Sequence, residues 1–288
     1  MMGGAMFRQR LHTEAAVTPQ PRIAALSMYD LPELQAANDA LWSAIAIRLE
    51  HYGVCNVPFG LSRDADFESC WRSPHLLLAQ ACGYPLITAL AGCVRLVATP
   101  RYQAPGCEGP FRRSALVVSA SSSARDLASL RGSRCAINDL RSASAMNLLR
   151  AAVAPIAAGA SFFQDVAITG SHLTSAEAVA SDSADLAALD AVTLAHLRRF
   201  RPALTKQLRV LVWTERTPGL PLITSSATDQ ATHRALLSAL DDVASDAALA
   251  DVRETLRLDG FNALPLSQYC ATLHLEERAR QYGYQTVR

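Results

Sequence analysis

The feature that most constrains this chain is a short apolar strand, residues 135–138, that runs directly into a serine-rich turn and then into a helix. Ser142 and Ser144 belong to a residue type that caps helix starts well. We expect the backbone N–H groups of Ala145 to Asn147 to point out of the helix end, where the helix dipole favours negative charge. The segment therefore predicts a cradle for an anion.

Apolar runs of strand length alternate with segments of helical spacing along most of the chain, and this pattern favours parallel α/β sheets. A strand at 22–27 precedes a helix over 32–52. The last quarter is predicted to be mostly helical, with helices over 229–247 and 266–282 and a turn at Gly260 between them. The other predicted strands are 96–99, 115–119, 134–138, 165–168, 186–189 and 209–213.

Other segments accompany the predicted cradle in a specific order. Leu-Ala-Ser-Leu-Arg-Gly precedes it at 127–132, Thr-Gly-Ser-His follows at 169–172, and Ala-Asp-Leu-Ala-Ala-Leu-Asp follows at 184–190. In this order they resemble the substrate-binding proteins of phosphate, phosphite and phosphonate ABC transporters, a PhnD-like family with the type II periplasmic binding protein fold. The likeness spans residues 23–283, and its further matches are Met28-Tyr29-Asp30, 80–85 and 217–221.

The resemblance implies an α/β protein of two lobes with a ligand cleft between them. It places a disordered N-terminal segment at 1–21, the first part of lobe 1 at 22–113, lobe 2 at 114–208 and the second part of lobe 1 at 209–288. Two departures from the family stand out. Ala145 occupies a position where many relatives carry glycine, and no secretion signal is recognisable in the first residues.

Ligands of open α/β sheets gather at the carboxyl ends of strands, so Ser142, Ser144, His172 and Asp190 should share one rim of lobe 2. Hydroxyls, backbone N–H groups near Ala145 and the imidazole would donate to a tetrahedral oxyanion. Asp190 is an acceptor, so it would serve a protonated ligand oxygen or an amine on a phosphonate side chain.

The resemblance adds two aromatic residues from lobe 1, Tyr29 and Tyr84, that close over the ligand. Structural roles remain open for several of these residues. His172 could cap the helix beginning near Thr174, Asp190 could be the N-cap of a helix over 191–200, and Tyr84 could pack in the core.

Charge and cysteine spacing exclude several functions. A net charge of +1 from 27 basic and 26 acidic residues gives no broad field for nucleic acid or an anionic membrane surface. The seven cysteines include no Cys-x-x-Cys pair, so no metal site is expected. No window is apolar enough to span a bilayer, and direct membrane insertion is not expected.

We therefore expect a substrate-binding protein for a small oxyanion, foremost phosphonate, phosphate or phosphite, that closes at a hinge in an ABC-type transport system, without catalysis or a cofactor. An ABC permease is the expected partner, and a monomer is the expected state. The alternatives are a cytoplasmic enzyme of the same fold acting on a cofactor precursor, or a ligand sensor. The location is periplasmic if a leader is missing from this start, and cytoplasmic as the sequence is written.

Overall fold

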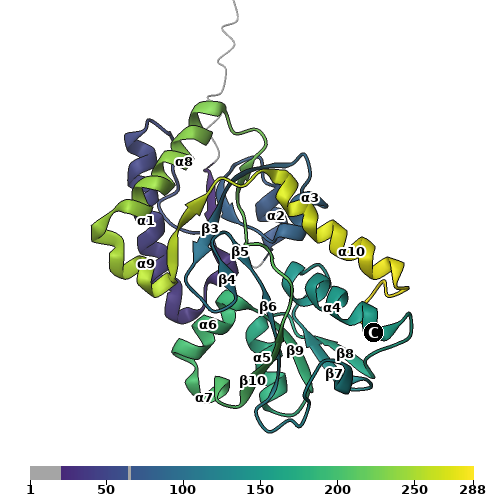
Figure 1. The fold of residues 1–288 in the computed structure, drawn as a ribbon. Helices are drawn as coiled ribbons and strands as arrows, with labels where there is room; N and C mark the ends of the chain where they lie inside the picture. Colours follow the sequence, from purple (N-terminus) through teal and green to yellow (C-terminus); the bar gives the residue numbers. More distant parts are fainter. Residues whose placement is uncertain (1–20, 64–65) are drawn as a thin grey trace, which may run out of the picture.

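The computed structural model describes residues 21–63 and 66–288, which form two α/β lobes (Figure 1). The predicted two-lobed α/β architecture is confirmed. Residues 1–20, where most of the predicted disordered segment falls, lie outside the described residues. Each lobe is built on a five-stranded sheet. In the first lobe the strands lie in the order β1 (Ile23–Ala25), β2 (Leu76–Gln80), β12 (Leu222–Ser225), β3 (Val94–Tyr102) and β13 (Leu258–Asn262).

The second sheet supplies the strand ends that form the cleft. Its strands lie in the order β10 (Leu208–Trp213), β6 (Ser114–Ser119), β9 (Leu186–Asp190), β7 (Arg134–Ile137) and β8 (Asp165–Ile168). A small three-stranded sheet joins the lobes in the order β11 (Thr217–Pro218), β5 (Phe111–Arg112) and β4 (Cys107–Glu108). We call this small sheet the hinge sheet.

Helices cover both main sheets because each sheet must bury two apolar faces. In the first lobe, α1 and α8 enclose a core that includes Trp42, Leu77 and Leu236. Its helices are α1 (Gln35–His51), α2 (Phe67–Arg72), α3 (Gly83–Ile87), α8 (Gln230–Ser245), α9 (Ala250–Leu256) and α10 (Ala271–Gln281). The second lobe carries α4 (Leu148–Ala157), α5 (His172–Ala180), α6 (Ala191–Phe200) and α7 (Pro202–Thr205).

Both main sheets combine parallel and antiparallel pairs, so the prediction of parallel α/β sheets holds for only part of each sheet. Strand β7 pairs in parallel with β8 and β9, and β1 pairs in parallel with β2. The chain enters the second lobe along β6 and leaves along β10, and these two strands run antiparallel to each other. In the first sheet, β12 runs antiparallel to β2 and β3, and β13 runs antiparallel to β3.

Three strands of the first sheet, β2, β12 and β13, were not predicted. Residues of β2 are buried on both faces, so the segment shows no apolar–polar alternation. Strand β13 contains Gly260, which the sequence placed in a turn. Gly260 has φ of 147° beside the Arg101 guanidinium, and the pairing of β13 with β3 is irregular between Leu258 and Gly260. The glycine therefore marks a bulge within a strand rather than a turn.

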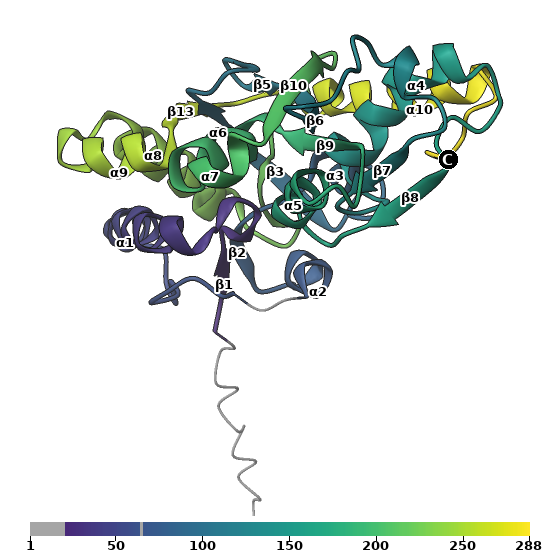
Figure 2. The same ribbon diagram turned by 90° about the horizontal axis from the view of Figure 1, so that it is seen from below.

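Two segments after residue 208 lie with the second lobe. Strand β10 forms the edge of the second sheet, and the side chains of Tyr284 and Val287 are buried in the second-lobe core. Helix α10 leads there by running alongside α4 (Figures 1 and 2). The carbonyl of Arg288 accepts from the backbone N–H groups of Phe162, at 2.7 Å, and Phe163. The chain thus ties the lobes together at a point away from the hinge sheet.

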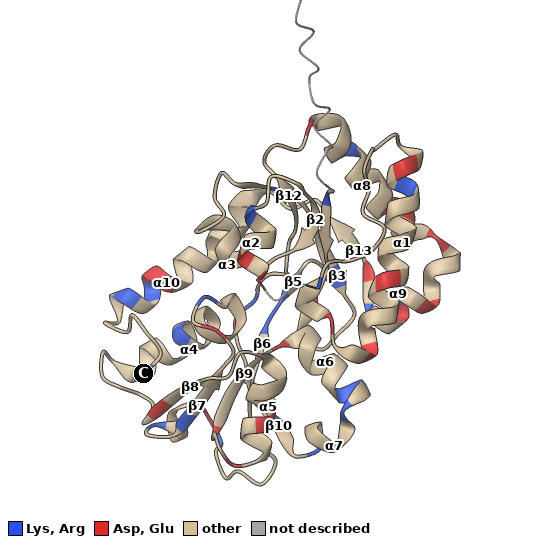
Figure 3. Ribbon diagram, turned by 180° about the vertical axis from the view of Figure 1, so that it is seen from behind, with Lys and Arg blue, Asp and Glu red and all other residues tan. Residues whose placement is uncertain are grey.

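Charged residues of both signs occur on both lobes (Figure 3), in keeping with the near-zero net charge. A basic stretch on β5 lies between the lobes in the same view. None of the helices within the described residues has the length and apolar character that crossing a membrane requires.

Candidate ligand-binding cleft

A cleft of about 350 Å³ lies between the two lobes. The first lobe contributes residues 27–32, together with Leu34, Phe67, Cys82 and Leu220. The second lobe contributes the residues that follow its strands, among them Ser142, Ser144, His172 and Asp190. The strand ends of β7, β8 and β9 therefore meet at one rim, as the sequence predicted.

Ser142 organises the turn that begins the helix after β7. Its Oγ accepts from the Ala145 N–H at 3.0 Å, and its carbonyl accepts from the N–H groups of Met146 and Asn147. This bonding to Ser142 makes the first turn wider than an α-turn. The N–H groups of Ala145 to Asn147 are therefore not free for a ligand, contrary to the prediction. Ala145 itself is fully buried in the second-lobe core.

The hydroxyls of this turn and an imidazole form a row of polar groups at the cleft. Ser142 Oγ lies 3.1 Å from Ser144 Oγ, which lies 3.1 Å from His172 Nε2. Burial lowers the pKa of His172 to about 4, so the imidazole is neutral at ordinary pH. Ser171 rather than His172 caps α5, through its Oγ and the Thr174 N–H at 3.0 Å. We call Ser142, Ser144 and His172 the cradle wall.

Asp190 is the N-cap of α6 and at the same time part of the cleft. Its Oδ1 accepts from the backbone N–H groups of Val192 at 2.9 Å and Thr193 at 3.2 Å. The same oxygen accepts from the Tyr29 hydroxyl at 2.8 Å, which links the two lobes. The capping role that the sequence left open is thus present, because the strand β9 ends one residue before the helix begins.

Arg112 forms an ion pair with the other carboxylate oxygen of Asp190. Both side chains are almost fully buried, Arg112 at 2 % and Asp190 at 1 % relative exposure. Burial alone would lower the pKa of the guanidinium, but the Asp190 carboxylate holds the pKa of Arg112 above its ordinary value. Arg112 comes from β5 of the hinge sheet and lies behind Asp190 as seen from the cleft. We call Tyr29, Asp190 and Arg112 the ion-pair wall.

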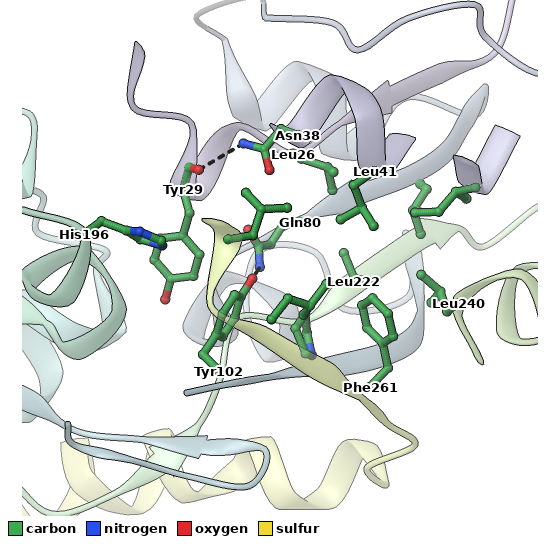
Figure 4. A pocket seen from close by; sticks show the side chains of 15 residues that line it. Leu26, Tyr29, Asn38, Leu41, Gln80, Tyr102, His196, Leu222, Leu240 and Phe261 are labelled. Carbon is green, nitrogen blue, oxygen red and sulfur yellow. Dashed lines mark hydrogen bonds between the residues drawn. The ribbon is translucent and has the colours of Figure 1, made fainter. Parts of the chain in front are cut away.

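Tyr29 is held in place by packing and backbone contacts behind the cleft (Figure 4). Its ring meets Tyr102 edge to face, with centroids 5.3 Å apart, and its carbonyl accepts from the Asn38 side-chain amide at 3.0 Å. Gln80 donates to the Tyr102 hydroxyl at 3.0 Å. Burial first, and Asp190 second, raise the pKa of Tyr29 well above its ordinary value. The phenol therefore stays protonated and donates to Asp190.

The pocket shown in Figure 4 is not the ligand cleft. It holds about 30 Å³, which is room for a single water, and its lining is mostly apolar. Tyr29 and His196 line both spaces. The small pocket therefore lies beside the side chains that support the Tyr29 ring.

Tyr84 does not line the cleft. Its hydroxyl donates to Glu276 at 2.7 Å, on α10, and its ring packs partly buried in the first lobe. Gln80 likewise serves to hold Tyr102 rather than to face the cleft.

Sequence reasoning missed Arg112 and His196. Arg112 lies on a two-residue strand, which is too short to show any periodicity. His196 lies on α6 and lines the cleft, and burial lowers its pKa to about 4. The one sequence feature that points to a cation is Asp190 itself, because a buried carboxylate needs a positively charged partner.

Ser144 and His172 are a hydroxyl and an imidazole in hydrogen-bond contact, the arrangement that nucleophilic enzymes use. However, no carboxylate within the described part of the chain accepts a hydrogen bond from His172 Nδ1. Nor do the described residues contain a group of three His, Cys, Asp or Glu side chains placed to hold a metal ion.

A family model described as the periplasmic phosphonate substrate-binding protein of ABC transporters matches residues 73–269. Comparison with curated proteins gives no match. Among solved structures, a binding protein component of an ABC phosphonate transporter from Pseudomonas aeruginosa is 18% identical, with a TM-score of 0.73 over 91% of this chain and 88% of that one. At this identity the likeness shows the fold.

Two other structures share the fold. PhnD1 from Prochlorococcus marinus, solved in complex with methylphosphonate, is 14% identical, with a TM-score of 0.72 over 91% of this chain and 98% of that one. A Xanthomonas citri protein solved with a chloride ion is 17% identical, with a TM-score of 0.70 over 91% of this chain and 98% of that one. Since the family model covers well over half of the sequence, this chain belongs to the family of periplasmic phosphonate substrate-binding proteins of ABC transporters.

Proposed function

We propose that this chain captures a small phosphonate in the cleft between its lobes and delivers it to an ABC permease. Its family consists of substrate-binding components of transporters rather than enzymes. The observation that carries the proposal is the cradle wall, where Ser142, Ser144 and neutral His172 face the cleft at the start of a helix. Hydroxyl and imidazole donors at such an end suit the oxygens of a tetrahedral anion.

The cleft favours a ligand with a single negative charge. No lysine or arginine is among the described residues that line it, and His172 is neutral above about pH 4. The Tyr29 hydroxyl donates its hydrogen bond to Asp190, so a lone pair of the hydroxyl oxygen can accept a hydrogen bond from the ligand. A monoanionic phosphonate carries a P–OH group that can donate there, whereas a dianion has no such proton.

Closure of the lobes around the ligand would be supported at the rim of the cleft. Glu33 of the first lobe pairs with Arg201 of the second at 2.6 Å, and Glu68 pairs with Arg141 at 2.7 Å. These pairs are partly exposed, so each contributes about 1 kcal/mol or less. Such weak contacts let the ligand's own binding energy decide between open and closed states, and the permease would recognise the closed one.

The proposed working state is a monomer in the periplasm, with the permease as its membrane partner. The family's location supports the compartment. Light scattering of the purified protein with and without ligand would test the monomer, and a stable dimer in both conditions would contradict it.

A thermal-unfolding screen tests the ligand class. We expect methylphosphonate to stabilise the protein more than phosphate, and phosphate more than sulfate, which carries no proton near neutral pH. At about 100 times its dissociation constant a ligand adds roughly 2.7 kcal/mol of stability, which shifts the midpoint measurably. No response to any oxyanion, together with a response to a cofactor precursor, would favour an enzyme of the same fold instead.

A further inference from the structure

We propose that Arg112 sets the charge selectivity of the cleft. By pairing with Asp190 it leaves no carboxylate open to an ammonium group, so the cleft takes phosphonates whose organic substituent is uncharged and excludes aminoalkylphosphonates. This inference rests on the proposed function. It assigns a specificity role to a residue that lies behind the cleft surface and touches no ligand.

Both carboxylate oxygens of Asp190 already have partners within the protein. Oδ1 accepts three hydrogen bonds, from the Tyr29 hydroxyl and the backbone N–H groups of Val192 and Thr193. Oδ2 meets the Arg112 guanidinium. Oδ1 therefore already accepts more hydrogen bonds than it has lone pairs, and Oδ2 is buried beside the guanidinium, so no accessible site remains for a ligand cation.

Displacing Arg112 from Asp190 is costly. The guanidinium is 2 % exposed, and its Nε has no hydrogen-bond partner among the described residues. A ligand ammonium that took its place at Asp190 would leave this cation buried and unpaired. The free-energy cost of leaving a buried charge without a partner exceeds the stabilisation that one new ion pair provides.

Asp30 is the other acidic residue in the described lining, and it is paired as well. Its Oδ2 accepts from Arg63 Nε at 2.7 Å, and its Oδ1 accepts from the Asn38 amide at 2.8 Å. Both carboxylates of the cleft therefore have an arginine partner, and Arg63 also pairs with Asp39 at 2.8 Å.

The space next to the cleft suits an uncharged substituent. A second pocket of about 550 Å³ shares Phe67, Cys82 and Ser142 with the cleft, and the side chains of Trp71 and Leu90 extend its apolar wall.

The carboxylates at the edge of this second pocket are engaged too. Arg141 pairs with Glu68 at 2.7 Å and with Asp139 at 3.4 Å, and Asp66 caps α2 through the Ser69 N–H. An alkyl or aryl group can occupy the apolar wall without removing a charge from water.

The test compares two ligands of the same shape, n-propylphosphonate and 2-aminoethylphosphonate, whose substituents differ in a terminal methyl or ammonium group. Calorimetric titration of the wild-type protein should show at least about tenfold tighter binding of n-propylphosphonate. Equal affinity, or tighter binding of the amine, would overturn the inference while leaving the proposed function intact. Absence of binding by both, and by methylphosphonate, would overturn the proposed function and this inference with it.

Variants of Arg112 separate its charge from its bulk. Arg112→Met frees the Asp190 carboxylate and should move the affinity ratio toward the amine by at least about tenfold. The double variant Arg112→Met with Asp190→Asn has no charge at either position, so it should again prefer n-propylphosphonate. The double variant also serves if the single one fails to fold. A ratio in the double variant that favours the amine would contradict the assignment.

Discussion

The two walls of the cleft handle charge in opposite ways. The cradle wall has only neutral groups, Ser142, Ser144 and His172, which hydrogen-bond one another at the cleft surface. The ion-pair wall contains two full charges, on Asp190 and Arg112, but these neutralise each other before any ligand enters. The difference teaches that a charged residue at a binding site need not contribute its charge to the ligand.

Breaking the ion-pair wall should have the largest effect on stability. Arg112→Met leaves Asp190 buried without its cation, and we expect the free energy of unfolding to fall by about 3–5 kcal/mol in urea titrations. Adding Asp190→Asn should restore part of that loss because the buried charge disappears. A cost below about 1 kcal/mol for Arg112→Met would mean that water already reaches Asp190.

Breaking the cradle wall should act on binding instead. Ser142→Ala with Ser144→Ala removes two hydroxyl donors to a charged ligand, each worth about 1.5–3 kcal/mol, so methylphosphonate affinity should fall about 100-fold or more. Calorimetric titration measures this.

Ser142 also caps a helix, so the loss of a cap needs its own control. Asp229→Ala removes the cap of α8, in the first lobe, and should cost about 1 kcal/mol of stability without changing affinity. Unchanged affinity in the double serine variant would exclude the cradle wall as the anion site.

The tyrosines test how the two walls cooperate. Tyr29→Phe removes the donor to Asp190, which should cost about 1–3 kcal/mol of stability and weaken methylphosphonate binding several-fold. Tyr84→Phe is the matched control, because its hydroxyl contacts Glu276 outside the cleft lining. A larger loss of affinity for Tyr84→Phe than for Tyr29→Phe would reverse the assignment of these two residues.

The smallest expected effect concerns pH. Burial lowers the pKa of His172 and of His196 to about 4, below the value near 6.5 of an unfolded chain. The unfolded state therefore binds more protons between these values, so stability is fully present above about pH 6.5 and decreases as pH falls toward 4. His172→Gln should flatten that decrease in thermal midpoints measured across this range, and an unchanged slope would contradict the neutral imidazole.

The cradle wall could be predicted from the sequence because its parts are local. Ser142 and Ser144 lie in the short turn and helix start that follow β7, and strand ends of one sheet meet at one edge. The predicted free N–H groups failed for a local reason too, since the Ser142 side chain and carbonyl take them up.

Of the ion-pair wall, Tyr29 and Asp190 could be predicted as site residues from the sequence, but Arg112 could not. Arg112 reaches Asp190 from the hinge sheet, far along the chain, and no short-range pattern links the two. Similarly, β2 is buried on both faces and β13 contains a glycine bulge, so neither shows the alternation by which strands are recognised.

A crystal structure of the protein grown with methylphosphonate would test the central claim most directly. We predict the phosphonate oxygens within hydrogen-bond distance of Ser142 Oγ, Ser144 Oγ and the Tyr29 hydroxyl, with Arg112 still paired to Asp190. A phosphonate bound away from both serines, or an Arg112 side chain released from Asp190 toward the ligand, would contradict the account.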